Sequence, residues 1–299
     1  MADNTPMGVI CINKHQGVTS HTIVNMIRRL YNTKQVGHTG TLDPMATGVL
    51  PVAVGGNAPR FIELLPSHDK GYRASFKLGT TTDTLDITGT VLSTCDNIPD
   101  EAEVKKAISH FQGETEQLPP MYSAIKKDGK RLYELARQGI EVEREKRIVT
   151  IYNCDFVFFE NGEYTIDVKC SKGTYIRSLI SDIGEMLGCG AVMTALRRTL
   201  SNGFSIEDAH TEDELKSAED VSQFIIPVDK ALGAYPEIKV SEAQAKRFRN
   251  GGELDAQRLH TKLHPSLYRV YAPDNTFLGL GEFRENETNL FVKRVFVND

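Results

Sequence analysis

Residues 37–51 restrict the backbone more than any other part of the chain. Their sequence is GHTGTLDPMATGVLP, with three glycines and two prolines. Glycine adopts backbone angles that other residues avoid, and Pro44 restricts Asp43 to an extended conformation. We therefore predict a stiff loop between a helix and a strand, in which the Asp43 carboxylate is held ready as a nucleophile or general base. The alternative is that Asp43 only caps a turn, as aspartate often does.

Short apolar runs and amphipathic segments alternate irregularly around this loop. A buried strand is predicted at residues 9–12, followed by a helix that Ser20 caps, because its apolar residues recur at helical spacing. The strand at residues 49–54 contains Pro51, which indicates a sheet edge or a strand start. The irregular order favours an α+β fold over a doubly wound sheet. Further predicted elements are a strand at 72–78, two strands at 147–159 and 164–168 joined across Asn161–Gly162, and a helix after Thr174.

The C-terminal part of the chain has a different pattern. An acidic segment, residues 207–220, has few apolar residues and separates the main body from this C-terminal part. From about Pro236 the pattern is that of one helix and then short strands. We therefore predict two domains, residues 1–234 and residues 235–299. The predicted elements of the second domain are a helix at 241–250, strands at 267–271, 277–281 and 290–292, and a hairpin turn at 273–275.

The net charge of −5 is unevenly distributed. Residues 207–220 contribute −6, so the rest of the chain sums to about +1. Basic residues cluster between residues 126 and 147. The charge therefore neither excludes RNA as a partner nor argues for it.

Five scattered cysteines, without a CxxC pair, favour reduced thiols over a disulfide framework or a zinc site. Residues 1–5 have no basic start and no apolar stretch comes after them, as a signal peptide would require. No apolar run is long enough to span a bilayer. We therefore expect a cytoplasmic protein that binds no metal and no membrane.

The loop at residues 37–51 resembles the catalytic loop of the tRNA pseudouridine-55 synthases, the TruB type of the pseudouridine synthase superfamily. The likeness covers roughly residues 8–232 and continues through five further motifs in the family's order. It implies an α+β fold with a mixed, largely antiparallel sheet, and it assigns the nucleophile to Asp43. The further motifs are DKGY (69–72), TDTLD (82–86), PMYSA (120–124), SKGTYIR (171–177) and LRR (196–198).

The resemblance also implies the reaction, the isomerisation of uridine 55 in the T loop of tRNA without cofactor or guide RNA. The N1–C1′ bond breaks and C5 joins C1′, so one carboxylate suffices, whereas a glycosidase needs a second acid for its leaving oxygen. Arg177 lies early in a helix, where a cation is mildly unfavourable, and the family pairs this arginine with the catalytic aspartate. Such a pair keeps Asp43 ionised and oriented. The matching Tyr72 stacks on the target base and helps to move the C5 proton.

Base flipping accounts for further residues, because a uridine in folded tRNA must leave its stack before it can react. His38 resembles the histidine that fills the vacated space, and Leu196 resembles the leucine that packs under the base. Lys14 resembles a lysine that contacts the loop or the RNA, although His15 stands where the family usually has proline. Tyr175, within SKGTYIR, is assigned to substrate binding.

Two parts of the chain resemble RNA-binding elements of the family. The insertion at about residues 120–147 resembles a thumb whose basic residues Lys126, Lys130 and Arg131 contact phosphates and fix register. Residues 235–299 resemble a PUA domain, a small β module that binds RNA helices. The predicted partner is therefore the T stem-loop of tRNA, bound by a monomer without an obligatory protein partner.

Three alternatives remain. A guide-RNA-dependent synthase of the archaeal and eukaryotic type has a similar catalytic loop, but the basic insertion, the short PUA-like part and SKGTYIR favour a stand-alone enzyme. A non-catalytic RNA-binding or tRNA-folding protein would not need Asp43, Tyr72 and Arg177 together. A glycosidase is the least favoured, because no second acid lies near Asp43 in the motif.

Overall fold

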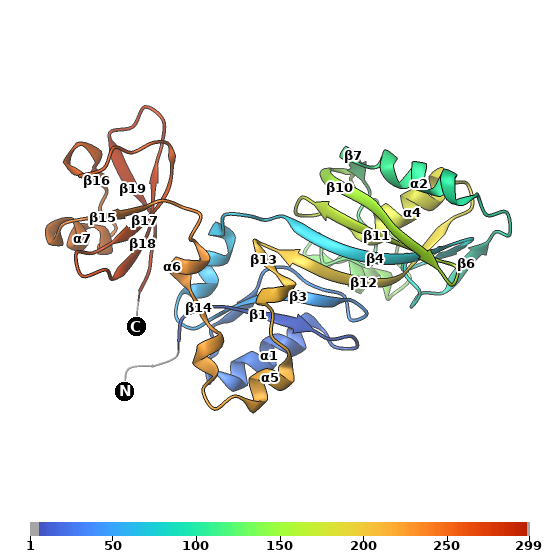
Figure 1. The fold of residues 1–299 in the computed structure, drawn as a ribbon, viewed down its shortest axis with the longest axis horizontal. Helices are drawn as coiled ribbons and strands as arrows, with labels where there is room; N and C mark the ends of the chain where they lie inside the picture. The colour runs from blue at the N-terminus through green and yellow to red at the C-terminus, as the bar shows by residue number, and fades with distance from the viewer. Residues whose placement is uncertain (1–5, 298–299) are drawn as a thin grey trace. The chain divides into compact units, whose positions relative to one another are not determined.

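The computed structural model describes residues 6–297 and divides into two compact units (Figure 1). The first comprises Met1–Pro44, Leu50–Ser67 and Asn202–Asp299, and the second comprises Met45–Val49 and His68–Ser201. Both combine helices with sheets in which most strand pairs are antiparallel, which confirms the predicted fold class. The predicted boundary between residues 234 and 235 falls inside the first unit and stays a prediction. The segment without signal-peptide features, residues 1–5, lies outside the described residues.

The first unit begins with strand β1 (Gly8–Lys14) and helix α1 (Ser20–Leu30). The helix buries the apolar stripe that its periodicity predicted. Its cap is Thr19, whose hydroxyl accepts from the Thr22 amide at 3.0 Å. The prediction of Ser20 as the cap is therefore wrong by one residue, because Ser20 is buried in the first turn and bonds elsewhere.

Strand β3 (Thr47–Val54) comes after the glycine-rich loop, and its neighbours in the first unit are β1 and β2 (Val36–His38). Pro51 therefore lies inside a strand with partners on both sides, and the prediction of an edge or a strand start is wrong. Proline lacks the backbone N–H donor but keeps the carbonyl acceptor. Pro51 O accepts a hydrogen bond from the Thr39 amide at 3.1 Å.

The acidic segment, residues 207–220, belongs to the first unit and pairs with β1. The His210 amide donates to Cys11 O at 2.9 Å, and the Asn13 amide donates to His210 O at 2.8 Å. Leu215 is fully buried. The segment is thus packed structure rather than a spacer. The elements here are β13 (Phe204–Ser205), η2 (Ile206–Asp208), α5 (Glu212–Ser217), η3 (Val221–Phe224), β14 (Ile226–Pro227) and α6 (Val228–Ala231); the short helix η1 (Ala58–Leu64) comes after β3.

The C-terminal part of the first unit has a five-stranded sheet of its own, in the order β15-β17-β18-β19-β16. Ser241 caps the helix of this part, and a buried cluster around Phe248, Val270 and Leu290 forms its core. The predicted helix and strands are confirmed. The elements are β15 (Glu237–Lys239), α7 (Glu242–Arg249), β16 (Leu254–Asp255), η4 (Ala256–Arg258), β17 (Ser266–Tyr271), β18 (Phe277–Phe283) and β19 (Asn289–Val295).

The second unit is built on a sheet in the order β12-β4-β11-β10-β7, and the first residues of β3 pair with β12. Helix α4 packs on β12 and helix α2 on β10, and the two helices contact each other beside this sheet (Figure 1). The predicted hairpin is confirmed: Asn161 and Gly162 both have positive φ, as a tight hairpin turn requires. The elements are β4 (Lys70–Leu78), α2 (Glu101–His110), β7 (Gly113–Gln117), β10 (Arg147–Glu160), β11 (Glu163–Cys170), α4 (Ile176–Met186) and β12 (Ala191–Ser201).

Two small hairpins complete the second unit. One pairs β5 (Thr80–Thr82) with β6 (Val91–Thr94), and the other pairs β8 (Lys126–Lys127) with β9 (Lys130–Arg131). Helix α3 (Leu132–Ala136) comes directly after the second hairpin and buries Leu132. The basic insertion thus has a defined local structure.

Candidate active site

The backbone on both sides of Asp43 is held by hydrogen bonds within the first unit. The Leu42 amide donates to the Ser20 hydroxyl at 2.8 Å, and that hydroxyl lies 3.1 Å from Leu42 O. On the other side, the Gly17 amide donates to Pro44 O at 2.8 Å. Leu42 is buried, whereas Asp43 is half-buried. The fixed neighbours keep the position of Asp43 defined while its side chain stays accessible.

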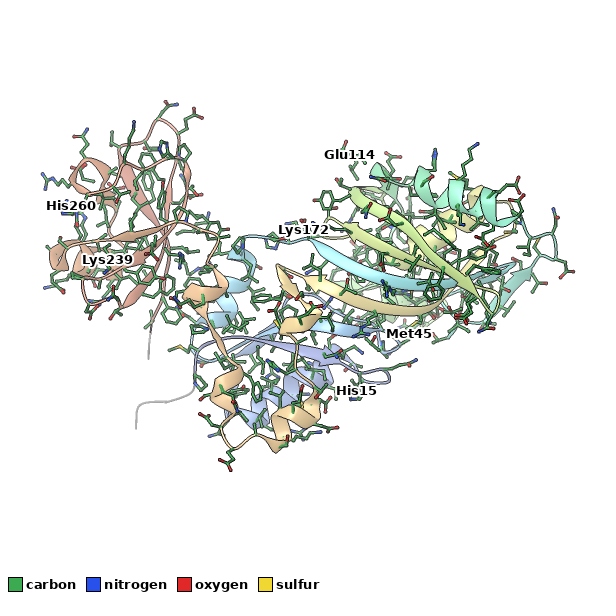
Figure 2. All side chains as sticks on the ribbon, viewed as in Figure 1. His15, Met45, Glu114, Lys172, Lys239 and His260 are labelled. Carbon is green, nitrogen blue, oxygen red and sulfur yellow. The ribbon has the colours of Figure 1, made fainter. Side chains whose placement is uncertain are left out.

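Lys14 is one of these fixing groups. Its side chain is fully buried, and the ammonium group donates to the carbonyls of His15 and Val18 at 3.0 and 2.9 Å. Pro44 O lies at 3.5 Å. The sequence led us to expect that Lys14 contacts either the loop or the RNA. A fully buried ammonium group cannot contact RNA, so its contacts fit the first of these roles. His15 is exposed (Figure 2) and pairs with Glu212 at 3.0 Å.

His38 lies at the end of β2 and is half-buried. Its Nδ1 accepts from the Gly40 amide at 3.2 Å, so the ring is fixed to the start of the loop. Gly40 has a φ of 121°, a conformation that favours glycine. The loop therefore orients the His38 ring through a glycine of its own sequence.

Tyr72 lies on β4 of the second unit, half-buried between Arg198 of β12 and Val168 of β11. Its side chain shares a hydrogen bond with the Arg198 side chain. Arg198 is 1% exposed and its Nε donates to Val49 O at 2.7 Å. Burial lowers the pKa of Arg198, while its contact with Tyr72 acts in the opposite direction. Tyr72 is thus held by a buried cation.

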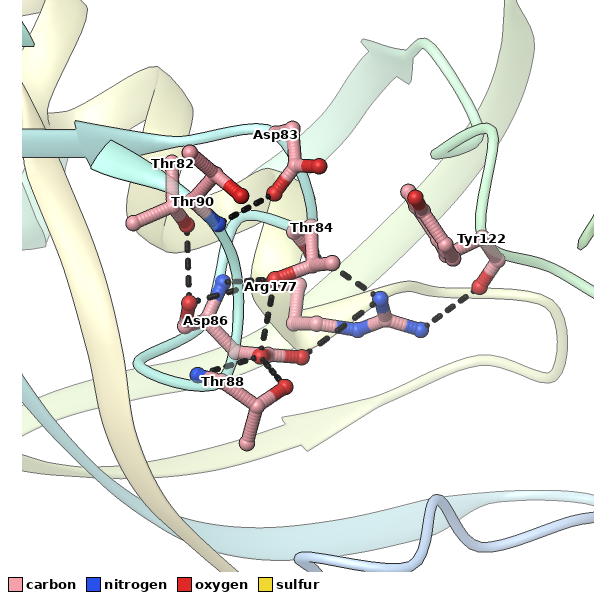
Figure 3. Close-up of polar contacts among 8 residues, drawn as sticks. All are labelled: Thr82, Asp83, Thr84, Asp86, Thr88, Thr90, Tyr122 and Arg177. Carbon is pink, nitrogen blue, oxygen red and sulfur yellow. Dashed lines mark hydrogen bonds and ion pairs between the residues drawn. The ribbon is translucent and has the colours of Figure 1, made fainter. Parts of the chain in front are cut away.

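Arg177 lies in the first turn of α4 and is 6% exposed. Its guanidinium donates to Thr84 O at 3.0 Å and to Tyr122 O at 2.8 Å (Figure 3). One carboxylate oxygen of Asp86 lies 3.7 Å from its Nη1. These acceptors offset the unfavourable place of a cation at a helix start.

Asp86 is itself buried and held by its neighbours in the loop after β5. Its Oδ1 accepts from the Thr84 hydroxyl at 2.9 Å and from the Thr88 amide and hydroxyl at 3.0 and 2.5 Å (Figure 3). A charge in this setting is tolerated because it is paired and hydrogen-bonded. From the sequence, Asp86 was only a member of the TDTLD motif and had no predicted role.

Tyr175 and Leu196 belong to different elements of the second unit. Tyr175 precedes α4, and its amide donates to the Gln117 side chain at 2.7 Å, while that side chain donates back to Tyr175 O at 3.0 Å. Gln117 thus fixes the backbone at the start of α4, and the half-buried Tyr175 ring is carried by it. Leu196 is 9% exposed and lies opposite Ala74 in the β12–β4 pair.

Lys126, Lys130 and Arg131 are all exposed on the hairpin β8–β9. Lys126 lies opposite Arg131 in its register, so like charges face each other. Such a pair repels unless a counter-charge or water separates it. The arrangement is suited to binding an anion.

Lys70 and Arg198, like Asp86, were missed as functional candidates, although both lie in motifs that resemble the family. Lys70 Nζ donates to the Ser201 hydroxyl at 2.9 Å. Burial, and secondarily the charge of Arg198, lowers the pKa of Lys70 to about 7. The only sequence signal was a basic residue inside a strand pattern, which is unusual where the strand is buried.

Within residues 6–297, no group of three or more His, Cys, Asp or Glu side chains is placed to hold a metal ion. All five cysteines are free thiols. No helix in the described part of the chain is long and apolar enough to cross a membrane.

Three family models match the chain in sequence. Residues 28–176 match the TruB family pseudouridylate synthase N-terminal domain, residues 177–233 the tRNA pseudouridylate synthase B C-terminal domain, and residues 236–296 the pseudouridine synthase II TruB C-terminal domain. Relatives named tRNA pseudouridine synthase B are similar over nearly their whole length. The protein from Clostridium kluyveri is 45% identical over 95% of this chain and 99% of its own, and that from Pseudomonas fluorescens is 41% identical over 93% and 92%.

Solved structures support the same assignment. A Cbf5-Nop10-Gar1 complex contains a chain that matches with a TM-score of 0.72 and 28% identity, covering 97% of this chain and 85% of that one. A chain in an H/ACA RNP bound to a substrate RNA matches with a TM-score of 0.71 and 25% identity, with the same coverage. The motifs, the fold and these likenesses agree: the chain belongs to the TruB family of pseudouridylate synthases and is an enzyme of the isomerase class.

Proposed function

We propose that this enzyme converts uridine 55 in the T loop of tRNA to pseudouridine, with Asp43 as the nucleophile. The substrate class is supported by full-length relatives named for tRNA, at 41–47% identity. The observation that carries the role of Asp43 is the fixation of both its neighbours, Leu42 by Ser20 and Pro44 by Gly17. A nucleophile works best when its position is fixed before the substrate arrives.

The reaction needs no external cofactor. Asp43 attacks the flipped nucleotide, the N1–C1′ bond breaks, and the uracil turns so that C5 bonds to C1′. The bond to Asp43 breaks again and frees the carboxylate, the C5 proton leaves, and N1 gains a proton. The enzyme takes the target out of its stack first, and the fixed His38 ring fills the space that it vacates. Leu196 and Tyr72 pack on the flipped base, and Tyr175 lies near it.

Arg177 is the proposed partner of the Asp43 carboxylate. Its guanidinium is preorganised by two backbone carbonyls and by Asp86, so little reorganisation is needed when the substrate binds. A guanidinium beside Asp43 orients the carboxylate. Lys14 acts indirectly, through the loop that carries Asp43.

The remaining proposals concern binding. Lys126, Lys130 and Arg131 contact phosphates of the T stem-loop and fix register without reading sequence. Residues 235–299 form a PUA-like domain that binds RNA, separate from a catalytic domain at residues 1–234. The enzyme acts as a monomer in the cytoplasm, without cofactor or obligatory protein partner.

The test uses a tRNA transcript with tritium at uracil C5 and purified enzyme without added metal, cofactor or RNA. Wild type should release tritium from the T-loop uridine, and Asp43→Asn, which keeps the shape of the side chain, should be slower by roughly 10⁴-fold or more. Binding of tRNA should persist in the variant. Release by Asp43→Asn at the wild-type rate would refute the nucleophile, and retained binding without release by either protein would favour a purely RNA-binding role.

A guide-dependent synthase is the second candidate, because the similar solved chains come from an H/ACA RNP and a Cbf5-Nop10-Gar1 complex. The identity to these chains is 25–28%, against 41–47% to the relatives named tRNA pseudouridine synthase B. The same tritium assay separates the two. Turnover by the isolated protein supports the stand-alone enzyme, whereas turnover only after addition of a guide RNA and partner proteins supports the alternative.

A further inference from the structure

Arg198 is buried far more deeply than an arginine on a strand usually is. Its side chain is 1% exposed, and Nε donates to Val49 O at 2.7 Å. Its side chain also shares a hydrogen bond with Tyr72. The proposed reaction gives Arg198 no role, although it contacts a residue that does have one.

The backbone of Arg198 is fixed as well. It pairs in parallel with Gly48, which has a φ of 100°. A Cβ added to Gly48 would lie 2.1 Å from Arg198 O, so only glycine permits this approach. Arg198 is therefore clamped against β3, the strand that comes directly after the Asp43 loop in sequence.

The contact with Tyr72 has a defined direction. A guanidinium only donates hydrogen bonds, so the phenol oxygen of Tyr72 must accept from Arg198. The phenol's own proton then points away from Arg198. The Tyr72 side chain is then held at both ends, by its strand, which has neighbours on both sides, and by the hydrogen bond at its oxygen.

We propose that Arg198, supported by Lys70, is a positioning residue that holds the hydroxyl end of the Tyr72 side chain where the ring can stack on the substrate uracil. The proposal rests on the proposed function, because Tyr72 acts there on the flipped base. Arg198 itself does not touch the substrate. Its effect on the reaction runs through the phenol oxygen of Tyr72.

Lys70 lies two residues before Tyr72, on the same face of β4, and its Nζ donates to Ser201 on β12. Burial lowers the pKa of Lys70 to about 7, the charge of Arg198 contributes to this lowering, and Cys170 and Asp69 act the other way. Asp69 also accepts from the Tyr152 hydroxyl at 3.3 Å. The bond from Lys70 to Ser201 ties β4 to β12 two residues from the Tyr72–Arg198 pair, and this is how Lys70 supports the pair.

The experiment is a double-mutant cycle measured as single-turnover tritium release from tRNA, with enzyme in excess. Arg198→Met should slow release on the order of 10²-fold, because a small misplacement of a reacting geometry costs about that much. In a Tyr72→Phe background, the same change should cost less than about threefold, since the oxygen through which Arg198 acts is gone. Arg197→Met, at the exposed neighbouring position, is the control and should keep the wild-type rate.

An equal cost of Arg198→Met in both backgrounds, with folded proteins, would overturn the proposal. If Arg198→Met does not fold, Arg198→Lys takes its place in the same cycle. Its cost should again be smaller in the Tyr72→Phe background, and an equal cost in both backgrounds would overturn the proposal. Absence of tritium release by wild type itself would instead refute the proposed function.

Discussion

Two antiparallel strand pairs of the second unit carry basic side chains in opposite environments. In β4–β12, Arg198 is buried and Lys70 is half-buried, and their side chains bond to Ser201, Val49 and Tyr72. In β8–β9, Lys126, Lys130 and Arg131 are exposed. The same residue types thus act as fixed parts of the interior in one pair and as a hydrated positive surface in the other.

The difference shows what burial does to a cation. Buried, it must be paired and hydrogen-bonded, and its charge becomes dependent on pH, as the lowered pKa of Lys70 indicates. Exposed, it keeps its charge and its mobility, which suits contacts with a phosphate backbone. We therefore expect the buried cations to position catalytic side chains and the exposed cations to contribute to the affinity for tRNA.

The comparison is tested most strongly by removing one arginine from each pair. Arg198→Met leaves Val49 O and the Tyr72 oxygen each without a donor, so it should lower the free energy of unfolding by roughly 2–4 kcal/mol. Arg131→Met, on the exposed hairpin, should change it by less than about 0.5 kcal/mol. Urea unfolding followed by circular dichroism measures both. Similar values for the two variants would break the comparison.

The pH dependence of stability gives a second test. Because the pKa of Lys70 is lowered to about 7 in the folded chain, the unfolded chain binds more protons between about pH 7 and its ordinary value near 10.5. The free energy of unfolding contributed by Lys70 therefore rises with pH across this window, by at most about 1.4 kcal/mol per pH unit. Lys70→Met should lack this rise and be more stable than wild type at pH 7. Parallel stability curves for the two proteins would show that Lys70 titrates normally.

The smallest effects are expected on the exposed hairpin. Single substitutions Lys126→Ala, Lys130→Ala and Arg131→Ala should each weaken tRNA binding and reduce the slope of log affinity against log salt by about 1. Their single-turnover rates at saturating enzyme should stay at the wild-type value. Filter binding at several salt concentrations measures the slope. A lower single-turnover rate with unchanged affinity for tRNA would instead indicate that the hairpin positions the bound RNA.

Much of the fold can be predicted from local sequence. Hydrophobic periodicity predicted α1, α4 and the hairpin β10–β11, because helix and strand periods and the Asn161–Gly162 turn are properties of neighbouring residues. The same reasoning placed a cap one residue late, at Ser20. Thr19 and Ser20 are both residue types that cap helices, and in the folded chain the Ser20 hydroxyl instead bonds to the backbone of Leu42 in the loop.

The sequence by itself determined the family and the stiff loop around Asp43, since both depend on residue types at fixed spacing within a short stretch. Only the tertiary structure decided that Pro51 lies inside a sheet, that Arg177 rests against Asp86, and that Arg198 is buried against Tyr72. These partners are separated by many residues along the chain. Which of them meet depends on the order of strands that are not consecutive in sequence, and the local pattern does not encode that order.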